Sequence, residues 1–127
     1  MKIFVFGNED LAMDSLPLKI LPELKKLFPE IDFVTKDPNE DWDDVGDITI
    51  IDTVVGITDV KVFNSLKDFS RAPRFSLHDF DAYTNLVMLE KLGKIKKVTI
   101  IGISPDTSEK ATLKEVGKII NRLWNTM

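Results

Sequence analysis

The sequence predicts an α/β fold of three layers, in which an open, mostly parallel, twisted sheet of about five strands carries helices on both faces. Two observations indicate this fold. Short apolar runs typical of strands buried on both faces recur at IFVF, ITII and VTIIGI. Segments with apolar residues at helical spacing separate these runs, as the crossover connections between parallel strands require.

Length and composition limit what the chain can be. The 127 residues suit one domain, and we expect residues 1–127 to share a single core. A formal charge of −4 argues against a nucleic-acid partner, because phosphate binding needs a basic face. Without cysteine there is no disulfide, thiolate ligand or thiol nucleophile. No signal-peptide pattern or membrane-length apolar run is present, so we expect a cytoplasmic protein without membrane insertion.

The first third of the chain predicts two strands and one helix. Residues 3–6 form a continuous apolar strand, and residues 31–35 alternate as a second. Apolar residues at helical spacing predict a helix over 16–28, which either kinks at Pro22 or begins near it, because proline lacks an N–H. Residues 37–47 hold six acids and predict a solvated, irregular connection.

The rest of the chain predicts three more strands and two more helices. Residues 48–51, 59–66 and 98–103 have strand patterns. The helix over 76–92 has Ser76 and Asp79 at capping-box spacing and Gly93 as its stop, and a closing helix covers 108–124. The stripe that the first of these helices buries is expected to comprise Leu77, Phe80, Leu86, Val87, Leu89 and Leu92.

Three side chains that could hold a metal follow the strands of this sheet. In open parallel sheets, sites form at the edge where the strands end, and the loops at this edge contain Asp14, Asp52 and His78. His78 is expected in the first turn of a helix, whose dipole favours the neutral imidazole that binds metals. Two carboxylates and one imidazole leave coordination positions open, as catalytic sites require, and zinc, nickel, cobalt and iron are all admissible.

Each of these residues also has an ordinary structural interpretation. Asp52 could be a turn or cap residue, Asp14 an N-cap, and His78 a surface histidine. The sequence contains no phosphate-binding GxxxxGK[ST] or GxGxxG motif, no GxSxG nucleophile elbow and no HExxH helix. Chemistry at this edge would therefore depend on carboxylates and imidazole.

Four segments, FVFGNEDLAMDS, TIIDTVVG, SLHDFDAYTNLVMLEKL and IIGISPD, resemble the hydrogenase maturation endopeptidases in their order and spacing. This family trims the C-terminus of a nickel-iron hydrogenase large-subunit precursor after nickel insertion. The resemblance covers nearly the whole domain and implies that Asp14, Asp52 and His78 bind the precursor's nickel during metal-dependent peptide hydrolysis. It also implies that the isolated site is empty or holds a surrogate divalent ion.

The sequence departs from this family at residues 13–15 (MDS), where members commonly read two acids and a glycine, and at TKDPNEDW, which replaces a Gly-rich turn. Two other functions stay open. One is a phospho-receiver domain with Asp52 as phosphoacceptor beside Glu9 and Asp10, although GISPD lacks the lysine that would pair with the phosphoryl group. The other is a non-catalytic docking module on the same fold.

Overall fold

The sheet has five strands in the order β2-β1-β3-β5-β4. The computed structural model describes residues 2–7, 10, 15–36, 46–54, 56–70 and 77–125. The four strands β1, β2, β3 and β5 are parallel, and β4 is antiparallel to β5 at one edge. The predicted α/β fold with a mostly parallel sheet is therefore confirmed. The strands are β1 (Lys2–Val5), β2 (Asp32–Thr35), β3 (Gly46–Thr53), β4 (Lys61–Phe63) and β5 (Ile95–Ile103).

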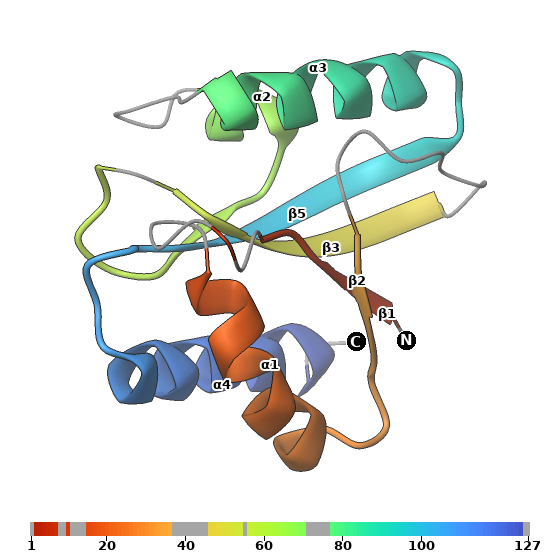
Figure 1. Ribbon diagram of the computed structural model, residues 1–127. Helices are drawn as coiled ribbons and strands as arrows, with labels where there is room; N and C mark the ends of the chain where they lie inside the picture. Colours follow the sequence, from red (N-terminus) through yellow and green to blue (C-terminus); the bar gives the residue numbers. More distant parts are fainter. Residues whose placement is uncertain are drawn as a thin grey trace.

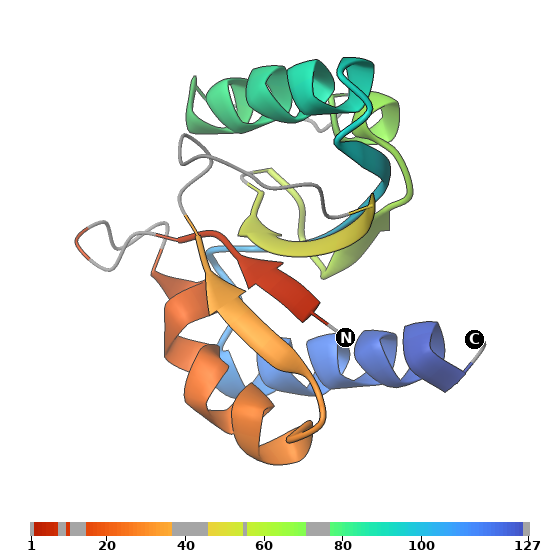
Figure 2. The ribbon, with the colours of Figure 1, turned by 90° about the vertical axis from the view of Figure 1, so that its right-hand side faces the viewer.

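Helices cover both faces of the sheet, as the two perpendicular views show (Figures 1 and 2). None of the helices among the described residues is both long and apolar enough to cross a membrane. The lower face in Figure 1 is covered by α1 (Leu16–Leu27) and α4 (Glu109–Asn125), and the upper face by α2 (Leu66–Phe69) and α3 (Leu77–Lys91).

The expectation of a single core is wrong: each face of the sheet has its own hydrophobic core, because successive side chains of a strand point to opposite faces. In β3, Ile48 and Ile50 pack in the cluster that includes Leu86 of α3. Ile51 belongs to the other cluster, with Val116 of α4 and residues of α1. The central strands are thus buried on both sides, which explains their continuous apolar runs.

Helix α1 runs without interruption through Pro22. The alternative that this helix begins near Pro22 is therefore wrong, and its first residue is Leu16. The ring of Pro22 lies on the exposed side. Burial of Leu21 and Leu24 on the opposite side outweighs the one backbone hydrogen bond that proline cannot donate.

The strand predicted over 59–66 is shorter than expected and is followed by a helix that the sequence analysis missed. Only Lys61–Phe63 pair as β4, and α2 begins after Ser65, whose hydroxyl oxygen accepts a 3.1 Å hydrogen bond from the Asp68 amide. The rings of Phe63 and Phe69 pack edge to face, with centroids 5.7 Å apart. This contact packs α2 against the strand that precedes it.

Two other boundaries differ from the prediction. Strand β3 begins at Gly46, so the irregular acidic connection predicted over 37–47 extends too far by two residues, and residues 37–45 lie outside the described part. The Leu92 side chain is 65% exposed rather than buried, because α3 ends at Lys91. The turn at Gly93, with φ of 77°, is closed by a hydrogen bond from the Lys94 amide to the Leu89 carbonyl, as in a Schellman motif.

Substituting Gly102 in β5 is expected to destabilise the protein. A Cβ atom there would lie 2.8 Å from Phe63 Cε2 and 2.9 Å from Val54 Cγ2. We expect Gly102→Ala to lower the free energy of unfolding by about 1–3 kcal/mol, the usual cost of overpacking. The matched control is Gly117→Ala in α4, where a Cβ atom meets nothing within 4 Å. Because alanine is the better helix former, this variant should raise the free energy of unfolding by up to about 1 kcal/mol. Urea denaturation measures both, and equal stability of the two variants would contradict the steric argument.

Candidate active site at the carboxyl edge of the sheet

Asp52 is a buried carboxylate near the end of the central strand β3. Its side chain belongs to a residue only 1% exposed, and it lies opposite Gly102 of β5 in the strand register. The Thr53 amide donates a 2.9 Å hydrogen bond to Oδ1, and Oδ2 is also shielded from solvent. An apolar side chain would suit this core at lower desolvation cost. The burial of a carboxylate at a strand end therefore indicates a functional role.

The Asp52 side chain points toward the face that α3 covers. Ile50 and Val54 flank Asp52 at two-residue spacing, and both belong to the core cluster beneath α3. Helix α3 starts above the end of the molecule where β3 and β5 finish (Figure 1). His78, whose side-chain placement is outside what the structure describes, is the second residue of α3. The prediction that it stands in a first helical turn is confirmed.

Asp14 lies outside the described residues, so its predicted metal ligation stays a prediction. The N-cap position of α1 belongs to Ser15, which is buried and whose carbonyl accepts hydrogen bonds from the amides of Leu18 and Lys19. The N-cap interpretation of Asp14 is therefore wrong. Within the described part of the chain there is no group of three acids or histidines that could hold a metal ion.

Two further polar residues lie at the ends of the central strands. Thr53 is 5% exposed, and its hydroxyl has no hydrogen-bond partner among the described residues. Ser104, 2% exposed, directly follows β5, and its hydroxyl oxygen accepts a 3.3 Å hydrogen bond from the Asp106 amide. The sequence analysis did not single out either residue. Ser104 could have been identified from the sequence, because the strand predicted over 98–103 ends just before it. Thr53 could not, because β3 extends two residues beyond the strand predicted over 48–51.

The sheet topology disfavours the phospho-receiver alternative. Receiver domains have the flavodoxin-like strand order 2-1-3-4-5. Here β5 lies next to β3, and β4 is the antiparallel strand outside it.

Comparison with known proteins identifies the fold. No protein-family profile matches the chain, and no curated protein matches it. The hydrogenase maturating endopeptidase HybD from E. coli has a similar structure, with a TM-score of 0.73 and 17% identity over 99% of this chain and 93% of that one. The solution structure of an endopeptidase from Escherichia coli matches with a TM-score of 0.68 and 18% sequence identity, over 94% of this chain and 90% of that one. The crystal structure of an uncharacterized protein from Wolinella succinogenes matches with a TM-score of 0.58 and 16% sequence identity, over 98% of this chain and 96% of that one. The resemblance drawn from the sequence is thus confirmed for the fold.

We expect acetyl phosphate to leave the protein unmodified. Asp52 lies in a sheet whose strand order differs from that of a receiver. The segment GISPD also lacks the lysine that would pair with a phosphoryl group. Intact-mass spectrometry after incubation with acetyl phosphate and Mg²⁺ checks this, with a receiver domain treated in parallel as the positive control. A phosphoryl adduct that disappears in Asp52→Asn would restore the receiver interpretation.

Proposed function

We propose that this protein is a metal-dependent endopeptidase that removes the C-terminal extension of a nickel-iron hydrogenase large-subunit precursor after nickel insertion. The observation that carries the proposal is the buried carboxylate of Asp52, directed at the face covered by the helix that begins with Leu77 and His78. The similarity in fold to a hydrogenase maturating endopeptidase supports the same class of reaction.

In this proposal, Asp14, Asp52 and His78 bind the nickel that the precursor brings, so the metal is part of the substrate. The donor set fits the ion, because imidazole and carboxylate ligands both bind divalent nickel. Three protein ligands would leave positions open for the precursor's own groups and for water. Burial of Asp52 strengthens its attraction to a cation, since charges interact more strongly where water is excluded.

The role of the protein is to hold this carboxylate still. Strand β3 is paired on both sides, with β1 and with β5, and the Thr53 amide orients the carboxylate of Asp52 through Oδ1. Because a ligand on such a rigid element is already fixed in place, its side chain loses little further conformational entropy when the substrate binds. Hydrolysis adds water to the scissile carbonyl carbon and passes a proton to the leaving amine. The nickel ion supplies polarisation of the carbonyl or of the attacking water.

The decisive experiment is incubation of the purified protein with a nickel-loaded large-subunit precursor, followed by mass spectrometry of the precursor. We expect loss of a C-terminal peptide. Replacing a metal ligand, as in Asp14→Asn, Asp52→Asn or His78→Ala, should slow cleavage by at least about a hundredfold. Lys96→Ala, at an exposed position near the start of β5, is the matched control and should cleave normally.

Three other results of this experiment would contradict the peptidase proposal or its assigned residues. An authentic nickel-loaded precursor that stays uncut by the wild-type protein would sink the peptidase proposal. Stable binding without cleavage would instead support the docking module. Normal cleavage by all three ligand variants would show that the reaction uses other residues.

Nickel alone should stabilise the protein if these residues bind it. A ligand that binds only the folded state at a concentration of one hundred times its Kd adds about 2.7 kcal/mol to the free energy of unfolding. We expect Ni²⁺ to raise the melting temperature of the wild-type protein and of Lys96→Ala, and a chelator to reverse the effect. Asp52→Asn should lose it. An identical shift in Asp52→Asn would contradict a role for this carboxylate in metal binding.

A further inference from the structure

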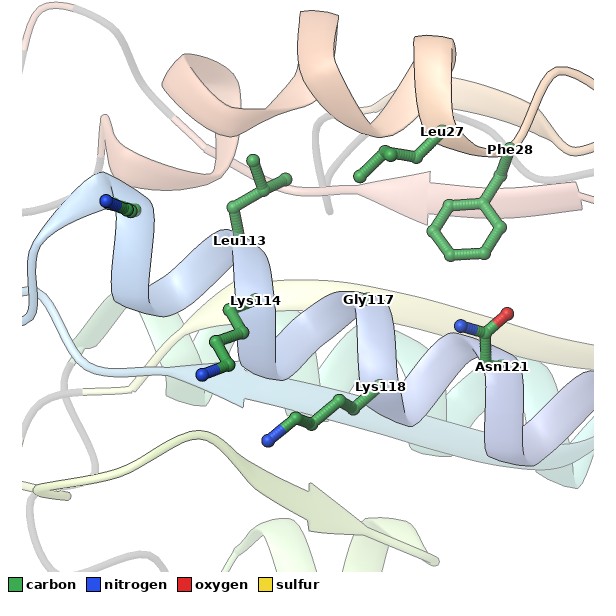
Figure 3. Close-up of a pocket in the computed structure, with 8 residues that line it drawn as sticks. Leu27, Phe28, Leu113, Lys114, Gly117, Lys118 and Asn121 are labelled. Carbon is green, nitrogen blue, oxygen red and sulfur yellow. The ribbon is translucent and has the colours of Figure 1, made fainter.

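A groove of about 500 Å³ lies between the end of α1 and the outer side of α4 (Figure 3). It is on the sheet face opposite α3, so it is separate from the carboxylate of Asp52, which points to the α3 side. Its residues combine apolar side chains with lysines and one asparagine, Asn121, and include no acid. No step of the proposed peptidase reaction uses it.

The floor of the groove is apolar and open. Leu27 is 57% exposed at the end of α1, and Phe28 and Leu113 continue the apolar surface. Figure 3 shows Gly117 on the side of α4 below Leu27 and Phe28. A Cβ atom at Gly117 would meet nothing within 4 Å, so packing within the chain does not require glycine there. Glycine is also a poor residue inside a helix. Its effect at this position is to leave the floor accessible.

The margin of the groove is positively charged. Lys110, Lys114 and Lys118 are spaced by four residues and form one stripe about 12 Å long on α4. Like charges at this spacing weaken a helix. Glu115 pairs with Lys118 at 3.5 Å, whereas Lys110 and Lys114 form no ion pair within the described part of the chain. The positive charge of this stripe is opposite in sign to the formal charge of −4 of the whole protein.

We propose that this groove is a docking site for an acidic, amphipathic helical segment of a partner protein. Apolar side chains of that segment would cover Leu27 and Leu113 and enter the space above Gly117. Its carboxylates, one per helical turn, would face the three lysines, because two helices side by side present charges with the same rise per turn. The two features of α4 that weaken it as an isolated helix, the lysine stripe and Gly117, thereby acquire a common explanation.

The test uses a synthetic peptide of leucine and glutamate that forms an amphipathic helix, titrated into the ¹⁵N-labelled full chain. We expect amide shift changes confined to residues 27–28 and 110–121. The charge reversal K110E/K114E/K118E should weaken binding by about tenfold, since an exposed ion pair contributes about 0.2–1 kcal/mol. Gly117→Trp should block the floor, while Gly117→Ala should bind nearly as the wild type does. The matched control K91E/K96E/K97E reverses the same number of exposed charges elsewhere and should bind normally.

Several results would overturn the proposal. One is no binding, or binding that the lysine and Gly117 variants leave unchanged. Another is an equally tight complex with a single-stranded oligonucleotide that the same variants abolish, which would identify a nucleic-acid site. Concentration-dependent dimerisation that K110E/K114E/K118E removes would identify a second copy of this chain as the occupant. Thermal melting of every variant checks that it folds, and the lysine variant keeps the test valid if Gly117→Trp does not fold.

Discussion

The parallel pairing of β3 with β5 is the interaction on which the rest of the structure depends. It extends from Gly46 opposite Ile95 to Thr53 opposite Ile103 and joins the two longest strands. Both strands are apolar on each side, so the pair contributes to both cores at once. The same register places the carboxylate of Asp52 beside a glycine, Gly102, where β4 can also pack closely.

The two faces of the sheet separate two potential functions. Asp52 belongs to the α3 face, together with the helix that carries His78, and a reaction there would use side chains from the ends of strands. The groove of α1 and α4 is on the opposite face, where a lysine stripe meets an apolar floor. Because the sheet lies between them, a partner held in the groove would leave the carboxyl edge free.

The sequence patterns predicted most of the elements but not all of their ends. The parallel strands at IFVF and VTIIGI, and the long helices over them, follow from apolar periodicity, which burial of one face or both imposes directly. The short helix α2 was missed although Ser65 and Asp68 stand at capping spacing in the sequence, because the alternation of apolar residues over 59–66 favoured a longer strand. The exposure of Leu92 likewise depends on where α3 stops, which the turn at Gly93 decides.

For the candidate site, the sequence by itself determined the chemistry that is available. It contains no cysteine and a single histidine, and an aspartate ends the central apolar strand. Only the tertiary structure decided that Asp52 is buried, that it faces α3, and that Gly117 opens a groove on the opposite side. The physical reason is that residue types limit which bonds can form, whereas burial and direction depend on strand register and helix packing between segments far apart in the chain.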